Sequence, residues 1–407
     1  MDVFSAARDV LKQGYLCDHC LGRQFAQLLS GFTNAERGRA LRLGLAMDYG
    51  VKKFEVAEEN FSGITMRKKG KNTPKNKQPA SCVLCFNFFQ RLDTTATMVA
   101  AAVKGYEFST FAIGTKVRGR LAEAEEKLWE ETGTEWCEPL NAEVNRELGK
   151  TVAKLLGKEP DEHNPEMMAT VTLGEHETVE VFPRSVYISG GYKKLVRGIS
   201  QSKWEKYKDS VEAQVARPFM KQTGAAGHAF HAAGREDVDA RCLDWRPFVV
   251  ELERPRKRLL DLQKGAAAIK RAGKVDVKDL RISDKQEVRR VKLLMPDKTY
   301  RVLASFERPL TRLDLKKLAQ LNGITVDQQT PTRVMHRRAD LNRKKRVKVV
   351  TAKLAGAKKL ELTITGQAGL YAKELVTGDN GRTRPSVAEL LGNKATILAL
   401  DVIKIHI

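Results

Sequence analysis

Apolar residues recur at two different periods in this sequence, and together they predict an α+β fold. Over residues 140–157 they fall at helical spacing, with Leu148, Val152 and Leu155 on one face and Gly157 as the stop. Residues 168–198 then alternate between apolar and polar side chains, as two strands joined by a short turn do. A helix followed by a strand pair is typical of a small α+β module.

Strand-like and helix-like segments alternate again in the C-terminal half. The strand-like segments are 246–253, 298–307, 359–366 and 396–407, and the helix-like ones are 310–323 and 384–392. Just before them, residues 202–212 are predicted to be helical and residues 221–234 irregular. A chain of 407 residues is too long for one ordinary core, and a polar, Gly- and Ala-rich stretch lies near residue 215. We therefore expect one domain over 1–215 and another over 216–407.

The charge of the chain indicates a polyanionic partner. Lys and Arg number 72 against 50 Asp and Glu, a formal net charge of +22 that points to nucleic acid. Residues 331–360 hold eleven Lys or Arg and one acidic residue, Asp340, which suits a phosphate-lined channel. Residues 66–80 are basic and contain two prolines, and we expect a loop that either contacts phosphate or is a solvated linker.

The start of the chain has no basic segment followed by an apolar one, and nowhere do 18 apolar residues run together. We therefore expect a soluble, cytoplasmic protein without a membrane partner. Six cysteines in such a compartment are not expected to form a disulfide framework.

Four of the cysteines have the spacing of metal ligands. Cys17 and Cys20 lie in CDHC, and Cys82 and Cys85 lie in CVLC. Two such pairs supply four thiolates on two tight turns, which suits tetrahedral zinc and leaves no position open for a substrate. We expect a structural zinc site, the alternative being that the cysteines are simply core residues. His19, inside the first pair, could replace a cysteine as ligand, but it is expected to be a surface histidine.

The stretch GREDVDAR (234–241) places charged residues immediately before an apolar strand. Taken alone, this stretch is consistent either with a solvated turn or with a functional site where the chain enters a core. Other motifs decide between these interpretations. They are CDHCLGRQF (17–25), LVRGISQSKW (195–204), GREDVDAR followed by RPFVVELERP (246–255), QQTPTRVMHRRAD (328–340) and GLYAKELVTGDNGRTRPSVAELLG (369–392).

In this order the motifs resemble the archaeal and eukaryotic tRNA pseudouridine synthase family that modifies positions 54 and 55 of the T-arm. The resemblance covers nearly the whole chain. It implies an accessory domain with a four-cysteine zinc site and a THUMP-like RNA-binding module. A pseudouridine synthase domain with a mixed, largely antiparallel sheet is expected to follow. It also implies tRNA as partner, no catalytic cofactor and no small-molecule co-substrate.

The resemblance also implies roles for single residues. The aspartate of the G-R-x-D turn, the catalytic nucleophile of the superfamily, matches Asp237. The two substrate-contacting tyrosines match Tyr300 and Tyr371, and the basic partner of the aspartate matches Lys373. Arg235 is a second candidate cation. Asp239, two residues further on, is the less favoured carboxylate.

Uridine isomerisation explains why these residue types are needed. The N1–C1′ bond must break and C5 must join C1′, which one carboxylate can start by attacking C1′, by adding to C6 or by removing a C2′ proton. Burial raises the pKa of a carboxylate, so a nearby cation is needed to keep it ionised. An aromatic ring can stack on the base when it leaves the RNA helix.

Two other classes of function remain as alternatives. One is a non-catalytic, zinc-stabilised RNA-binding protein. The other is a different THUMP-bearing enzyme, a thiouridine synthase or a methyltransferase. Against the latter, Tyr192 and two lysines follow the Ser-Gly-Gly of residues 189–191, where the pyrophosphatase loop needs an acidic residue, and no G-x-G-x-x-G follows a predicted strand. The sequence leaves open whether one or both T-arm positions are modified.

Overall fold

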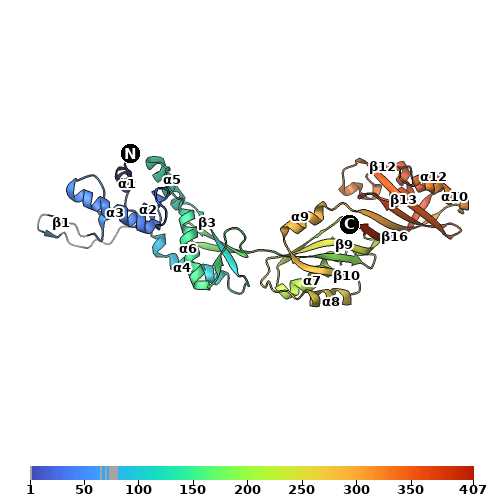
Figure 1. Ribbon diagram of the computed structural model, residues 1–407, viewed down its shortest axis with the longest axis horizontal. Helices are drawn as coiled ribbons and strands as arrows, with labels where there is room; N and C mark the ends of the chain where they lie inside the picture. The colour runs from blue at the N-terminus through green and yellow to red at the C-terminus, as the bar shows by residue number, and fades with distance from the viewer. Residues whose placement is uncertain (1, 65–66, 69–70, 73–80) are drawn as a thin grey trace. The chain divides into compact units, whose positions relative to one another are not determined.

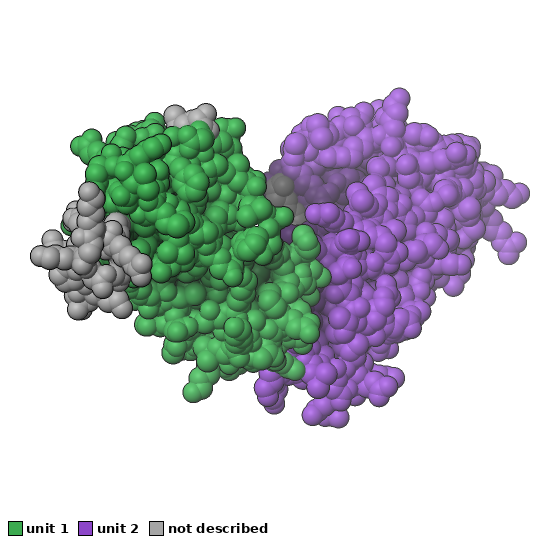
Figure 2. Space-filling model, turned by 60° about the vertical axis from the view of Figure 1, so that its left-hand side comes forward, with its two compact units in different colours: residues 1–184 green, residues 185–407 purple. Residues whose placement is uncertain are grey.

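The computed structural model describes residues 2–64, 67–68, 71–72 and 81–407. Within them the chain forms two compact units, residues 1–184 and 185–407 (Figures 1 and 2). The segment predicted as a basic loop, 66–80, lies outside the described residues except for a pair of two-residue antiparallel strands, β1 (Arg67–Lys68) and β2 (Lys71–Asn72). None of the described helices combines the length and the apolar composition that crossing a membrane requires.

The first unit packs helices against a small sheet. Its helices are α1 (Val3–Lys12), α2 (Asp18–Arg23), α3 (Asn34–Val51), α4 (Leu92–Ala102), α5 (Arg120–Thr132) and α6 (Leu140–Leu156), with short 3-10 turns at Ala26–Leu28, Glu58–Phe61 and Phe88–Gln90. The sheet has the order β4-β3-β5-β6 and consists of β3 (Thr110–Val117), β4 (Glu159–Pro160), β5 (Met167–Leu173) and β6 (Thr178–Pro183). Strand β3 pairs parallel with β4 and β5, whereas β5 and β6 form an antiparallel hairpin.

The helix predicted from periodicity is present in this unit. On α6, Leu148 and Val152 are buried as predicted, whereas Leu155, near the end of the helix, is exposed. Gly157 ends the helix in the left-handed conformation that glycine adopts without strain. Residues 168–198, predicted to be two strands, hold three: β5 and β6 form a hairpin here, and the third, residues 186–194, belongs to the second unit. Buried and partly exposed residues alternate along β5, so one of its faces lies on the core.

The second unit is built on one long sheet. Its strands are β7 (Val186–Lys194), β8 (Gly227–Ala232), β9 (Ala240–Glu253), β10 (Val275–Ser283), β11 (Asp297–Phe306), β12 (Thr325–Gln329), β13 (Asn342–Gly356), β14 (Lys359–Gly366), β15 (Thr383–Arg384) and β16 (Ala395–His406). The order is β10-β7-β9-β16-β11-β14-β13-β12-β15, with β8 paired to β9. Only β9 and β16 pair in parallel among the described strands of this sheet, so the predicted mixed, largely antiparallel sheet is confirmed.

Two groups of helices cover the two ends of this sheet, and one further helix, α9 (Lys285–Leu293), packs separately against β9 (Figure 1). The helices are α7 (Val211–Thr223), α8 (Leu262–Arg271), α9 (Lys285–Leu293), α10 (Arg312–Lys317), α11 (Ala372–Thr377) and α12 (Val387–Leu391), with 3-10 turns at Leu318–Leu321, Thr332–Arg337 and Asp379–Gly381. One apolar core joins α7 and α8 to β7, β9 and β10. A second joins α11 and α12 to the strands from β11 to β14 and to β16. The two cores adjoin at the β9–β16 pair.

The division between the units differs from the expected domain boundary at 215/216. Strand β7 pairs with β9 and β10, so residues 186–194 belong to the large sheet although they continue the strand-like alternation of the first unit. Local alternation shows that a segment is a strand but not which strand it will pair with.

Two local predictions before the second half were wrong. Residues 202–210 are not helical: Trp204 and Tyr207 form an isolated bridge. Helix α7 begins only after Ser210, whose hydroxyl accepts a hydrogen bond from the Ala213 N–H at 3.0 Å. Residues 221–234 are not irregular, because they hold the end of α7 and all of β8. Pairing with β9 makes a strand of a Gly- and Ala-rich segment that has little strand propensity of its own.

Candidate active site

The charged stretch GREDVDAR is the turn between β8 and β9, where β9 begins its parallel pairing with β16. Gly234 opens this turn with a φ of +79°, a conformation that favours glycine. A Cβ at this position would lie 3.3 Å from Nη1 of Arg246 and 3.5 Å from Nζ of Lys298. Glycine at this position therefore lets the turn pass close to two cationic side chains, where a residue with a side chain would be crowded.

Two cations contact the carboxylate of Asp237. Nη1 of Arg333 donates to Oδ1 at 2.8 Å, and Nζ of Lys373 lies 3.2 Å from Oδ2. The Asp237 side chain is 26% exposed, so the group is partly removed from water but still open to the pocket. These three residues come from the β8–β9 turn, the 3-10 turn at Thr332–Arg337 and α11.

Opposing effects act on the ionisation of Asp237. Burial raises its pKa, while the charges of Arg333 and Lys373 and their hydrogen bonds lower it, and the net result is a pKa below the usual value of 3.8. Asp237 is therefore a carboxylate, not a carboxylic acid, at neutral pH.

Asp239 shares Lys373 with Asp237 but has a different environment. Nζ of Lys373 donates to both oxygens of Asp239, at 2.7 and 2.8 Å. The Asp239 side chain is 69% exposed, whereas that of Lys373 is only 13% exposed. Lys373 thus lies between the two carboxylates, and Asp237 is the one turned into the protein.

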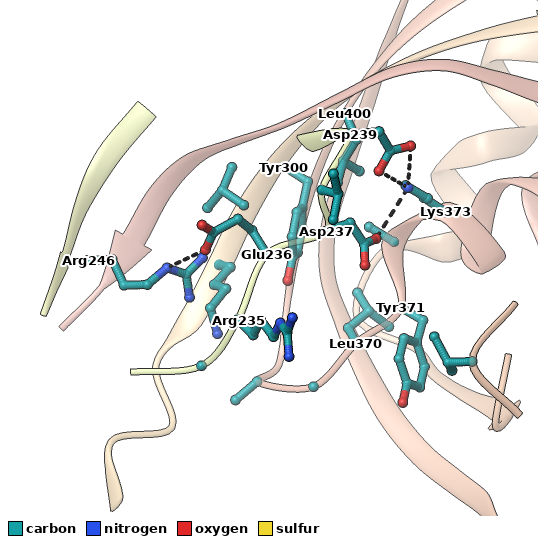
Figure 3. A pocket seen from close by; sticks show the side chains of 18 of the residues that line it. Arg235, Glu236, Asp237, Asp239, Arg246, Tyr300, Leu370, Tyr371, Lys373 and Leu400 are labelled. Atoms are coloured by element: carbon teal, nitrogen blue, oxygen red, sulfur yellow. Dashed lines mark hydrogen bonds and ion pairs between the residues drawn. The ribbon is translucent and has the colours of Figure 1, made fainter. Parts of the chain in front are cut away.

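Asp237 lines a pocket of about 920 Å³, together with the other residues predicted for the site. Figure 3 shows Asp237, Lys373, Tyr300, Tyr371 and Arg235 around this space. Residues separated by more than a hundred positions in the sequence are therefore brought together as the family resemblance implied.

The two tyrosines of the pocket differ in character. Tyr300, on β11, is 9% exposed, and burial raises its pKa to about 12. Tyr371, which precedes α11, is half-buried, and its hydroxyl accepts a hydrogen bond from Nη1 of Arg338 at 2.8 Å. The buried Gln328 amide bonds both the N–H and the carbonyl of Tyr371, at 2.9 and 3.1 Å, and so fixes its backbone.

Arg235 lines the pocket with an exposed side chain, and the cation that joins Lys373 on Asp237 is Arg333. Arg333 lies in the motif QQTPTRVMHRRAD, but its role could not be predicted from the sequence. Its Nε also donates to Oε1 of Glu374 at 2.7 Å, so Arg333 bridges the β8–β9 turn and α11. Arg333 is one of eleven Lys or Arg residues in the segment 331–360, and nothing in the sequence distinguishes it from the others.

The four cysteines form a cluster in the first unit. Their sulfur atoms all lie within 4.8 Å of one another, and Sγ of Cys17 is 3.6 Å from Sγ of Cys85. Zinc–sulfur bonds of about 2.3 Å in a tetrahedron separate the sulfurs by about 3.8 Å, so the cluster fits a metal ion of that kind. The two cysteine turns are joined by the Val83 N–H, which donates to the Tyr15 carbonyl at 3.0 Å.

His19, expected to be a surface histidine, is partly buried, and its ring contacts residues outside the cysteine cluster. Nδ1 of His19 lies 2.8 Å from Oε1 of Glu143, and the ring stacks on Phe89 with a centroid distance of 4.1 Å. The ligand set that fits the metal consists of the four cysteines.

Comparison with known protein families identifies the family of this chain. Residues 187–406 match the family model described as Pus10, C-terminal, and residues 95–172 match the model described as Pus10 THUMP domain, archaeal. The chain belongs to the Pus10 family of tRNA pseudouridine synthases. It is therefore an isomerase with a THUMP domain ahead of a synthase domain, in agreement with the predicted fold and enzyme class, and not a non-catalytic RNA-binding protein.

Relatives named tRNA pseudouridine synthase Pus10 match nearly end to end. The protein from Methanothrix thermoacetophila is 38% identical over 99% of this chain and 94% of its own length. The one from Pyrococcus furiosus is 36% identical over 99% of this chain and 98% of its own. Among solved structures, a chain of a Cbf5-Nop10-Gar1 complex covers 53% of this chain and 48% of its own at 15% identity, and its TM-score of 0.33 is too low to add to the family assignment.

Proposed function

We propose that this chain converts uridine to pseudouridine at position 54, position 55 or both in the T-arm of tRNA, with Asp237 as the catalytic nucleophile. The observation that carries this proposal is the ionised carboxylate of Asp237, which two cations hold at the wall of a large pocket. An ionised carboxylate has a lone pair available for attack at C1′ or C6 or for removal of a C2′ proton.

The reaction is an isomerisation, and its atoms balance within the nucleotide. The N1–C1′ bond breaks, the uracil turns, C5 bonds to C1′, and the proton that leaves C5 is replaced by one at N1. No electron or group enters from outside, so the proposal includes no catalytic cofactor and no small-molecule co-substrate. Lys373 and Arg333 act by keeping Asp237 charged and by fixing its two oxygens.

Each tyrosine contributes in a way that matches its environment. Turning the target base out of the stack costs a few kcal/mol, and stacking on an aromatic ring returns about 1 to 3 kcal/mol. The half-buried ring of Tyr371 faces the pocket and suits this contact. Tyr300, whose pKa is raised to about 12, stays protonated at neutral pH, so we propose that its phenol contacts the base as a neutral group.

The basic residues of the pocket supply the proposed contacts with tRNA phosphates. Arg338, Arg343 and Lys345 line the same cavity as Asp237 and come from the segment predicted to hold a phosphate channel. Such contacts position the RNA and carry most of its salt-dependent affinity. We further propose that the four-cysteine cluster binds one structural zinc ion, and that the enzyme acts in the cytoplasm, where its tRNA substrate is found.

The test is to incubate the protein with an unmodified tRNA transcript and to map pseudouridine by carbodiimide treatment and primer extension. Stops at position 54, at position 55 or at both are expected, and transcripts with cytidine at one of these positions serve as the control. A transcript that gains no pseudouridine in its T-arm would refute the proposed specificity.

A further inference from the structure

Side chains of one neighbouring segment bind the backbone of the turn that carries Asp237. Lys194, the last residue of β7, donates from Nζ to the carbonyl of Asp237 at 2.9 Å and to that of Val238 at 3.1 Å. Nε2 of Gln201 donates to the carbonyl of Gly234 at 2.9 Å. The carbonyls of Gly234, Asp237 and Val238 are therefore all held by side chains from β7 and the loop that follows it.

The end of the turn is held by the same segment. Nη1 of Arg197 donates to the carbonyl of Asp239 at 2.8 Å and to that of Leu400, on β16, at 2.6 Å. The Gly198 N–H donates to the carbonyl of Val238 at 2.9 Å. Arg197 thereby joins the turn to the neighbouring strand of the second core.

Glu236 anchors the turn from the opposite side. Figure 3 shows that Glu236 and Asp237 leave the turn in different directions, Glu236 toward Arg246 and Asp237 toward Lys373. The Glu236 side chain is fully buried, with Oε2 3.2 Å from Nε of Arg246 and 2.9 Å from the Tyr192 hydroxyl that donates to it. Glu236 and Asp237 therefore contact different cations on opposite sides of the turn, which fixes the direction of both side chains.

The burial of Lys194 shows that its ammonium has a specific task. The residue is 0% exposed, and burial lowers its pKa although nearby carboxylates, including Glu236 and Asp237, oppose this shift. Removing a charged ammonium from water is unfavourable unless it gains partners. An apolar side chain at the end of β7 would avoid this desolvation cost. A lysine here therefore indicates that the position needs the hydrogen bonds that Lys194 donates to the turn.

We infer that residues 194–201 form a clamp that fixes the turn 233–239, with Lys194 as the positioning residue that sets the location of the Asp237 carboxylate. This inference rests on the proposed catalytic role of Asp237. It also assigns a task to the motif LVRGISQSKW, of which Arg197, Gly198 and Gln201 are parts. Lys194 acts through the backbone of the turn: it contacts the carbonyls of Asp237 and Val238 and is not itself one of the residues that line the pocket.

The test measures the single-turnover rate constant of pseudouridine formation at saturating enzyme, together with the affinity for tRNA and the melting temperature. Lys194→Met keeps the length of the side chain but removes its charge and donors. A displacement of about 1 Å in a reacting group can slow a reaction about 100-fold, and a loss of this order is expected. Affinity for tRNA should change by less than about threefold, because an interaction used only to position the reacting group lowers kcat and not binding.

Two further variants separate positioning from a general effect of charge. Lys193 is the adjacent residue on β7, and its Nζ lies over the Trp245 ring at 4.3 Å, away from the turn. Lys193→Met should therefore keep the wild-type rate. Lys194→Arg keeps a charge and donors and should recover most of the rate that Lys194→Met loses.

Three results would overturn the inference. They are a folded Lys194→Met protein with the wild-type rate, a loss of tRNA affinity that accounts for the whole loss of rate, and a failure of both Lys194→Met and Gln201→Met to fold. The last result would make the clamp a folding element only. The proposed function fails separately, if the wild-type chain forms no pseudouridine or if Asp237→Asn reacts at the wild-type rate.

Discussion

Replacing Arg333 by Met should move the acid limb of the pH–rate profile to higher pH. In the wild-type protein Arg333 and Lys373 together hold the pKa of Asp237 below 3.8, against the effect of burial. Removing one cation leaves the burial in place and therefore raises the pKa. Because the reaction needs the ionised carboxylate, the rate then begins to fall at a higher pH as acid is added.

The size of this shift follows from the geometry. With Nη1 of Arg333 2.8 Å from Oδ1 of Asp237, the centres of charge are about 4 Å apart, and at an effective dielectric constant of about 20 the attraction is about 4 kcal/mol. The Arg333 side chain is 35% exposed, so water screens part of this attraction. A shift of roughly 1 to 2 pH units remains, within the range typical of an aspartate beside an arginine.

The assay is kcat/KM for tRNA between pH 4 and 8, because this ratio reports ionisation in the free enzyme. Arg333→Lys keeps the charge and should retain most of the wild-type profile. Arg333→Met also leaves the buried Glu374 without its cation, so the double variant with Glu374→Gln separates lost stability from the altered pKa. If the profiles of both Met-containing proteins stay as flat above pH 4 as that of the wild type, Arg333 does not control the ionisation of Asp237.

Three further outcomes are expected. The protein should bind one zinc ion per chain. The double variant Cys82→Ser, Cys85→Ser should release the zinc and unfold the first unit, since such a site contributes on the order of 10 kcal/mol to folding. Full metal content in the double variant would refute the site. Lys344 and Arg346 lie exposed on β13, so replacing both by Ala should reduce the log–log salt slope of tRNA binding by roughly 1.4 to 1.8, and an unchanged slope would place the phosphate contacts elsewhere. Three arginines lower the pKa of Asp401 to about 2, although burial opposes this shift. The stabilising contribution of Asp401 is therefore present above pH 4 and is lost as the pH falls to about 2. Asp401→Asn should lower stability at pH 7 and flatten the acid-unfolding curve between these pH values, which thermal melts can measure.

The sequence predicted those features that depend on local pattern or on an ordered motif. Helical spacing located α6, and apolar segments located β9, β11, β14 and β16. The two cysteine pairs do form one cluster. The motif match placed Asp237 and Lys373 in one pocket although 136 positions separate them, a proximity that only the family resemblance could have implied.

The features that were missed depend on tertiary pairing. Strand β7 was assigned to the first domain because its partners, β9 and β10, lie far along the chain. Strand β8 has too little propensity to be recognised without β9. Lys194 and Arg333 each lie in a basic segment, where a lysine or arginine is expected to face solvent. Only the folded structure shows that Lys194 binds the backbone of the turn and that Arg333 binds the Asp237 carboxylate.

The central claim, that Asp237 carries out the chemistry, is tested most directly by the single-turnover rate of Asp237→Asn on an unmodified tRNA transcript, with Asp239→Asn as the matched control. The amide is nearly isosteric with the carboxylate, so tRNA affinity should stay close to wild type, because phosphate contacts supply most of it. The account predicts no detectable pseudouridine with Asp237→Asn, since a neutral amide can neither attack carbon nor act as a base, and a far smaller loss with Asp239→Asn. Pseudouridine formed by Asp237→Asn at the wild-type rate, or activity lost only in Asp239→Asn, would contradict it.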